Sequence, residues 1–353
     1  MADNTKVWDA IRFDIDHSGE LGQFILTGSA VPIESRDIIH TGTGRFTRLA
    51  MRTMSLYESQ ESSGEVSLTG LFNTKKDIEG TSQLDLERLA FITCRVDWAQ
   101  SIVMRDTIVL DQAKYYYDAI VRTDINHASG IKIRQEKVRK FMQSYARNQG
   151  SQVSNESLAR DVIGSNEKTI SSDSVAIYSD SLKKIFVIEE MDAWHPNLRS
   201  KTAIHSSKTR YFMDPSIAAA ALGIGPNDLL NDLNTFALLF ETLCIRDLRV
   251  YADALDGSVY HYRDKLGLEC DAVIHLRNRK YGLIEIKIGS EKLIEESAKN
   301  LKSLESKIDF EKMNKPSFLM VLTGVGNYAY RRDDGVLVVP IGCLKKLALI
   351  FTN

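Results

Sequence analysis

The sequence predicts a multidomain α/β protein. Its 353 residues correspond to two or three domains, at roughly 100–200 residues for each. Hydrophobic residues make up 43% of the chain, which is enough to form real cores. Helical and strand-like patterns alternate after residue 201, whereas the middle of the chain is mainly helical in pattern. The 45 basic and 47 acidic residues nearly cancel, which excludes a globally basic nucleic-acid-binding protein but leaves room for a local basic face.

The cysteines and the apolar segments predict a cytoplasmic protein. No two of the four cysteines form a CxxC pair, so neither a zinc ribbon nor a disulfide framework is indicated. No apolar run approaches the ~18 residues that a membrane span requires, and the first six residues contain no signal-peptide core. We therefore expect a soluble protein in a reducing compartment, with no membrane as partner.

Residues 1–60 have the pattern of an incomplete α/β unit. Trp8, Ile11 and Ile15 recur at helical spacing and predict a helix that ends in the polar turn after it. The short apolar run Phe24-Ile25-Leu26 is typical of a strand buried on both faces of a parallel sheet. Residues 60–83 read as a linker, because they are rich in Ser, Glu, Gly, Thr and Lys. Helical periodicity then extends from about residue 84 to residue 125.

Residues 129–200 predict a winged helix-turn-helix module. Helices are expected over about 133–145, 154–163 and 169–182, followed by a strand over 185–188. In such a module the third helix contacts DNA, whereas the alternative is a packing or dimerisation module. Lysines near the third helix are accompanied by Asp173 and Asp180, so its face is not strongly basic.

Residues 201–353 predict an α/β sandwich. One helix carries Phe236, Leu239, Phe240 and Leu243 on a single face, and a second, charged helix covers 291–307. The expected strands lie at 259–262, 270–274, 283–287, 318–322 and 336–339.

Two of these strands carry the sharpest chemical feature of the sequence. If their hairpin is centred on Asn278, Asp271 lies opposite Glu285 and Glu269 lies opposite Lys287. Side chains that face each other in this way have Cβ atoms ~4.5–5.5 Å apart. Two carboxylates at that separation repel each other unless a cation bridges them, and Mg²⁺ or Mn²⁺ suits such oxygen ligands. With a neighbouring lysine to orient a water molecule, this layout predicts metal-assisted phosphodiester hydrolysis.

The alternative is a solvent-facing hairpin in which Glu269 pairs with Lys287 and the other acids are hydrated. Register decides between the two, because a slip of one residue moves every side chain to the other face. Binding of a phosphate backbone also needs basic side chains nearby. The sequence offers Arg246, Arg249, Arg263, Lys265, Arg277, Arg279 and Lys280.

Glu241, Asp271 and Glu285-x-Lys287 are similar to the PD-(D/E)XK nuclease signature. From near residue 7 to near residue 343, the chain also resembles a bacterial and archaeal AAA-type ATPase family with a C-terminal domain of unknown function. The segments that carry this resemblance are Phe24–Ala30, Gly42–Arg45, Met51–Leu56, Asp192–Trp194, Arg199–Lys201, Tyr211–Ser216 and Gly267–Asp271.

The resemblance implies a P-loop AAA+ core, a helical lid (61–128), a winged helix (129–200) and a nuclease-like domain (201–353). It implies Asp271 and Glu285 as ligands of Mg²⁺ or Mn²⁺, Lys287 as the catalytic lysine and Glu241 as a supporting acid. Possible partners are DNA, a second copy of the chain or another ATPase subunit.

The chain departs from this family at its start, because the P-loop string GxxxxGK[ST] does not occur in it. Residues 1–60 then resemble the C-terminal remnant of an AAA+ core with its sensor strand. Thr27, Ser29 and Arg45 would be vestigial nucleotide sensors. ATP hydrolysis by this chain alone is not expected, because nothing would position the phosphates and Mg²⁺.

Three hypotheses stay open from the sequence. The first is a metal-dependent nuclease or a nucleic-acid-binding derivative of one. The second is an ATP-binding ATPase subunit that is truncated or completed by another chain. The third is a non-catalytic scaffold with an inert nuclease-like domain.

Overall fold

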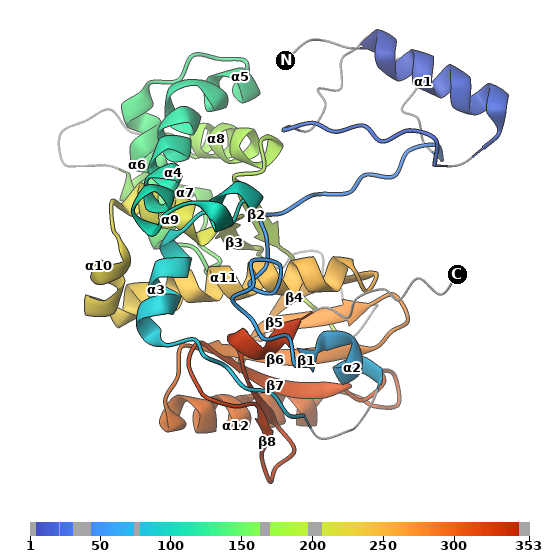
Figure 1. Cartoon of the computed structure of the whole chain (residues 1–353), viewed down its shortest axis with the longest axis vertical. Coiled ribbons are helices and arrows are strands. Elements are labelled where there is room, and N and C mark those ends of the chain that lie inside the picture. The colour runs from blue at the N-terminus through green and yellow to red at the C-terminus, as the bar shows by residue number, and fades with distance from the viewer. Residues whose placement is uncertain are drawn as a thin grey trace.

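The computed structural model describes residues 5–20, 22–30, 44–73, 78–162, 170–196 and 207–345, and the structural statements below refer to these residues. A helical part lies above a six-stranded mixed sheet (Figure 1). The first three strands form an antiparallel meander, and the next two continue the sheet in parallel to the third. In sheet order the strands are β4 (Gly257–Arg263), β5 (Glu269–Leu276), β6 (Tyr281–Lys287), β7 (Phe318–Thr323), β9 (Leu337–Pro340) and β8 (Tyr330–Arg331).

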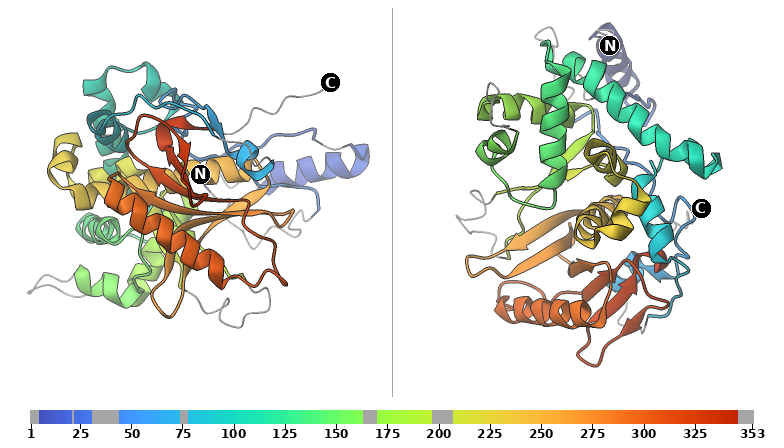
Figure 2. Two further views of the ribbon diagram at one scale, coloured as in Figure 1. Left: turned by 90° about the horizontal axis from the view of Figure 1, so that it is seen from below. Right: turned by 90° about the vertical axis from the view of Figure 1, so that its left-hand side faces the viewer.

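Two long helices lie against the sheet (Figure 2). The apolar face that the sequence predicts for α11 (Leu233–Asp253) is buried, and Asp232 caps its first turn by accepting hydrogen bonds from two backbone N–H groups. The predicted charged helix is α12 (Glu291–Lys307), which buries only a narrow apolar stripe. Side chains of β6 and β7 point alternately to the two faces of the sheet and belong to two separate hydrophobic cores. One of these cores includes the buried stripe of α12. The predicted α/β sandwich is therefore confirmed as a mixed α/β arrangement.

The helical part contains the elements predicted for residues 129–200, in the predicted order. Ser154 caps the second of the three helices by accepting a hydrogen bond from the Ser157 N–H. The strand begins at Ile188 and not at Ile185, because Phe186 adopts a positive φ of 56° in a turn. Residues 163 and 169, the predicted inner ends of two helices, lie outside the described residues. The predicted elements are α6 (Gln135–Arg147), α7 (Asn155–Asp161), α8 (Ser172–Lys184) and β2 (Ile188–Met191). The antiparallel partner of β2 is β3 (Thr209–Phe212), which lies beyond residue 200 and was not predicted.

The remaining helices pack around these elements, so the three helices are not a separate body. The π-helical turn Ile120–Asp124 continues one of these helices into the next. The other elements are α3 (Leu86–Cys94), the 3₁₀ turn Ala99–Val103, α4 (Asp106–Ala119), α5 (Ile125–Ser129), α9 (Pro215–Leu222) and α10 (Pro226–Asn231).

The N-terminal segment forms a helix but not the predicted strand. Helix α1 (Thr5–Ser18) is present, whereas residues 22–30 are neither helix nor strand. All three residues of the run Phe24-Ile25-Leu26 are exposed, Ile25 to 90%. A short apolar run becomes a buried strand only beside another strand that takes up its hydrogen bonds, and none of the described strands pairs with this one. The expectation of a sensor strand from an AAA+ core in residues 1–60 is therefore wrong for this segment.

Part of the segment 60–83, read as a linker, forms short elements against the C-terminal region. The short strand β1 (Val66–Ser67) pairs in parallel with β10 (Leu344–Lys345), which follows the 3₁₀ turn Ile341–Cys343. Helix α2 (Leu68–Asn73) follows, and the Phe72 ring packs edge-on against Phe318 at the start of β7.

A buried ionic network joins the two parts of the molecule. The Arg246 guanidinium on α11 contacts Asp97 at 2.5 Å, Asp247 at 2.8 Å and Asp214 at 3.6 Å. Asp97 also pairs with Arg95 at 2.7 Å. All of these side chains are almost completely buried, so their charges are balanced by each other and not by water. The network therefore holds α11 against the helical part of the molecule.

All four cysteines are buried and unpaired. None of the helices in the described residues combines the length and the apolar character that a membrane crossing demands.

Candidate functional site

The hairpin register that the sequence predicts is confirmed. β5 and β6 pair antiparallel with Ala272 opposite Ile284 and His275 opposite Tyr281, so the hairpin is centred on Asn278. The ladder ends at Ala272 and Ile284. Asp271 and Glu285 are therefore the first pair beyond it, at the point where the two strands separate.

A β-bulge in β5 makes Asp271 available there. Tyr260 of β4 is opposite Val273, but Tyr262 is opposite Cys270, so Asp271 and Ala272 together face a single residue of β4. A bulge of this kind bends its strand and re-aims a side chain. The Asp271 carboxylate accepts a hydrogen bond from the Ile286 N–H at 2.7 Å. This side-chain contact links β5 to β6 beyond the last backbone pair of the ladder.

Lys287 bridges the two carboxylates that the sequence places opposite each other. Its Nζ lies 2.9 Å from Asp271 Oδ2 and 2.9 Å from Glu285 Oε2. The Glu285 side chain is 4% exposed, whereas those of Asp271 and Lys287 are 19% and 27% exposed. Glu269 pairs instead with Arg263 at 3.1 Å. The alternative in which Glu269 neutralises Lys287 is therefore wrong.

Glu241 reaches the same group of charges from α11. The Tyr211 hydroxyl at the end of β3 donates a hydrogen bond to Glu241 Oε1 at 2.7 Å. On the other side lies Gly150, whose φ of +68° favours glycine and whose missing Cβ would lie 3.1 Å from the same oxygen. Glu241 sits deep in the protein, yet part of its surface stays open. Neither Tyr211 nor Gly150 is identified as a site residue by the sequence, because each reaches Glu241 through tertiary contacts alone.

The shared charges shift the protonation of these groups. Burial, and then the negative charge of Asp271, raises the pKa of Glu285 and of Glu241 to about 8, although Lys287 opposes the shift in both. Burial lowers the pKa of Lys287, but the charges of Asp271 and Glu285 outweigh it and the net shift is upward. At neutral pH the site therefore holds a charged lysine and at least one protonated carboxyl group.

The raised pKa of Glu285 predicts a pH-dependent stability of the metal-free protein. Between its ordinary value of 4.5 and about 8 the folded state holds a proton that the unfolded state has released, so stability falls as pH rises through this window. Urea unfolding in a chelator should show the wild type losing on the order of 1–2 kcal/mol more than Glu285→Gln between about pH 6 and pH 8. Equal losses in the two proteins would contradict the raised pKa.

The carboxylates of the candidate site are suitable ligands for a divalent cation, but they are not arranged as a complete coordination site. No group of three or more His, Cys, Asp and Glu side chains in the described part of the chain is arranged to hold a metal ion. Mg²⁺, however, is commonly held by one or two carboxylates with water as the other ligands. Asp271 and Glu285 already lie close enough to share one ammonium nitrogen. A cation would take the place of that nitrogen, so Lys287 has to move when the cation enters.

The other residues singled out from the sequence lie elsewhere or are already paired. Thr27 and Ser29 are exposed, and Arg45 pairs with Asp16 of α1, so these three residues form no site together. Arg246 and Arg249 are buried in ion pairs and cannot belong to a basic surface.

The rest of the expected basic flank is also partly neutralised. Arg263 and Arg277 pair with Glu269 and Asp256, and Lys280 donates hydrogen bonds to Phe72 and Asn73. Lys265 and Arg279 are exposed, so the basic surface is smaller than the sequence suggests.

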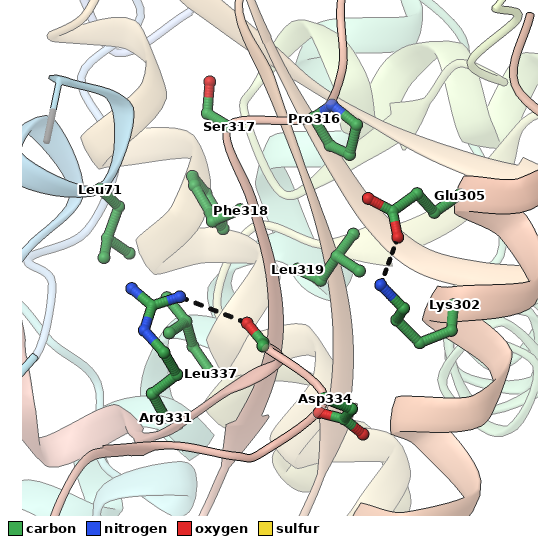
Figure 3. A pocket seen from close by; sticks show the side chains of 11 residues that line it. Leu71, Lys302, Glu305, Pro316, Ser317, Phe318, Leu319, Arg331, Asp334 and Leu337 are labelled. Atoms are coloured by element: carbon green, nitrogen blue, oxygen red, sulfur yellow. Dashed lines mark hydrogen bonds and ion pairs between the residues drawn. The ribbon is translucent and has the colours of Figure 1, made fainter. Parts of the chain in front are cut away.

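A cavity of about 370 Å³ lies at the other end of β7, beside its first residue Phe318 (Figure 3). The charged side chains that line it already have partners: Lys302 pairs with Glu305 at 2.5 Å, Arg331 donates to the Gly335 carbonyl, and Asp334 pairs with Arg332 at 3.1 Å. None of the four candidate site residues lines it.

Two family models match adjacent stretches of the chain. A domain of unknown function (DUF8612) matches residues 101–228. A second domain of unknown function (DUF4143), often found in AAA-ATPase-associated proteins, matches residues 237–344. No curated protein and no solved structure matches the chain. Tyr211 lies in the first matched stretch. The four candidate site residues, Glu241, Asp271, Glu285 and Lys287, lie in the second. Residues from both matched stretches therefore contribute to the candidate site.

Proposed function

We propose that this protein is a Mg²⁺- or Mn²⁺-dependent nuclease-like protein that acts on nucleic acid in the cytoplasm. The observation that carries the proposal is the Lys287 ammonium held at 2.9 Å from both Asp271 and Glu285, on two strands that separate at that point. Two carboxylates and a lysine in such proximity are the groups that metal-assisted phosphodiester hydrolysis needs.

Each residue has a distinct role in this proposal. Asp271 and Glu285 would hold the cation, which when bound would stabilise the charge that develops on the phosphate and lower the pKa of a water molecule. Lys287 orients that water and the phosphate, because its ammonium has three donors on a flexible stem. Glu241 is a supporting acid, and the Tyr211 hydroxyl orients its carboxyl group. The bulge at Asp271 and Ala272 supports this assignment, since bulges are common beside active sites.

DNA is the substrate class that the resemblance suggests. In the proposed winged helix, Lys184 at the end of α8 would approach the backbone phosphates, whereas the neighbouring Lys183 pairs with Glu190 at 2.9 Å. Lys265 is exposed in the turn that precedes β5 and would add a positive charge near the end of β5 that carries Asp271.

Nucleotide hydrolysis is assigned to another polypeptide or segment in this proposal, because the sequence contains no P-loop. An ATPase subunit or a second copy of this chain is the expected partner. The match to a domain often found in AAA-ATPase-associated proteins supports such an association.

A non-catalytic scaffold is the second candidate, and one observation favours it. Lys287 and Tyr211 already satisfy the carboxylates of Asp271, Glu285 and Glu241. In that case the three acids and the lysine form a structural ion pair network, and no cation enters.

DNA cleavage in the presence of Mn²⁺ separates the two candidates. The wild type should cut plasmid DNA, and Asp271→Asn should lower the rate by more than about 100-fold, because the amide keeps the shape but not the charge of a metal ligand. Glu269→Gln is the matched control: it changes a neighbouring acid of the same strand, one that pairs with the exposed Arg263, and it should cut normally. Equal rates in all three proteins, or no cleavage by any, would remove the catalytic role.

A further inference from the structure

Thr323 carries a buried hydroxyl without a hydrogen-bond partner among the described residues. It is the last residue of β7 and only 1% exposed, and its Oγ1 is enclosed by protein. Buried polar groups are nearly always paired, so an orphaned one calls for an explanation. An unpaired buried hydroxyl is also costly to keep, since its lost contact with water is not replaced.

The sheet places this hydroxyl beside the candidate site. β6 and β7 are parallel, and Lys287 and Thr323 are paired positions in their register. Paired positions of neighbouring strands share a face. Leu283 and Val321, which precede them at alternate positions, both belong to the core on that face. Thr323 therefore lies on the same face of the sheet as Glu285 and Lys287. It is on β7, the strand on the other side of β6 from Asp271.

A cation held by Asp271 and Glu285 would compete with Lys287 for the acceptors that it now uses. In the metal-free state both carboxylates accept from its Nζ, at 2.9 Å each. A cation held by the two carboxylates would repel the ammonium and weaken these contacts, and a partly buried charge without partners is strongly unfavourable. The lysine stem is long enough and flexible enough to turn away from the carboxylates, and a hydroxyl oxygen can accept a hydrogen bond from an ammonium group.

We propose that Thr323 accepts a hydrogen bond from Lys287 when a divalent cation is bound. Lys287 thus has two positions: bridging Asp271 and Glu285 without the cation, and bonded to Thr323 Oγ1 with it. Thr323 is then a positioning residue that acts through Lys287. The hydroxyl of Thr323 is unpaired without the cation because it is the acceptor for the second position of Lys287. This inference rests on the metal site of the proposed function.

The variant Thr323→Val tests the inference, because it removes the hydroxyl and keeps the shape. Calorimetric titration of the full chain with Mn²⁺ should show about tenfold weaker binding than in the wild type, the usual size of a lost hydrogen bond to a charged group. Thr323→Ser should bind as the wild type does. Without metal, Thr323→Val should unfold at the same temperature as the wild type or a higher one, since it removes an unpaired buried polar group.

Two controls make the result specific. Ser179→Ala removes another buried, unpaired hydroxyl, on α8 far from the sheet, and should leave Mn²⁺ affinity unchanged. In a Lys287→Met background, Thr323→Val should no longer weaken Mn²⁺ binding, because the group it serves is gone.

Several outcomes would overturn the inference. Equal Mn²⁺ affinity in Thr323→Val and the wild type would show that the hydroxyl has no role in the bound state. An equal loss with and without Lys287 would show that it does not act through the lysine. A lower unfolding temperature of metal-free Thr323→Val would assign it a structural role. If the wild type itself binds no Mn²⁺, the proposed function fails and this inference fails with it, which the titration of the wild type alone reveals.

Discussion

Replacing Lys287 by Met should strengthen metal binding while it abolishes most of the cleavage. The ammonium occupies the position that a cation would take between Asp271 and Glu285, so its removal eliminates both a competitor and a repulsive charge. Opposite charges a few ångströms apart in a partly buried site interact by several kcal/mol, so affinity for Mn²⁺ should rise by about tenfold or more. Loss of the group that orients the water should lower the cleavage rate by about 100-fold or more.

The two effects are measured on the same protein by calorimetry and by DNA cleavage. Both should be recorded at about pH 8.5, where protons compete less with the metal for the carboxylates than they do at neutral pH. Lys287→Arg is the matched control, since it keeps the positive charge and should bind Mn²⁺ no more tightly than the wild type. Weaker binding in Lys287→Met would mean that the lysine organises the carboxylates and does not exclude the cation.

Replacing Arg246 by Met should destabilise the protein by about 3–5 kcal/mol, the usual cost of leaving buried charges without their partner. Arg246 balances Asp97, Asp247 and Asp214 at the centre of the molecule, and none of these acids is accessible to water. A loss of this size is a large fraction of the stability of an ordinary domain.

Urea unfolding measures the loss, and Arg246→Lys is the comparison. Lysine keeps the charge but cannot reproduce the planar fork that contacts several carboxylates at once, so it should be intermediate. The surface pair of Arg277 and Asp256 provides the second control, because Arg277→Met removes an exposed ion pair and should change stability by less than about 1 kcal/mol. A loss below about 1 kcal/mol in Arg246→Met would contradict the role of the network.

The sequence predicts most of the sheet and the hairpin register, for a local physical reason. The strands of residues 257–340 are marked by short apolar runs, and the turn around Asn278 fixes which residues face each other. Three of the four site residues, Asp271, Glu285 and Lys287, lie on that one hairpin. Their meeting could therefore be predicted without knowledge of the rest of the fold.

Other features depend on contacts that no local pattern contains. The bulge at Asp271 arises from a mismatch in residue count between β4 and β5, and it appears only when the two strands are paired. Tyr211 reaches Glu241 from a different part of the chain. The run Phe24-Ile25-Leu26 has the composition of a buried strand, but burial is a property of its surroundings.

The arginines on α11 illustrate the same limit. Arg246 and Arg249 look like surface charges in the sequence, yet acids from distant segments bury them in ion pairs. A basic surface therefore cannot be read from arginine positions alone, because only tertiary structure decides whether a charge faces water or a carboxylate.

The position of a bound cation is the most direct test of the account. Anomalous diffraction from crystals of the full chain grown with Mn²⁺ should show one peak between the Asp271 and Glu285 carboxylates, with the Lys287 ammonium moved from its bridging position. A Lys287 that still bridges the two carboxylates, with no Mn²⁺ between them, would contradict the proposed metal site and favour a structural ion pair.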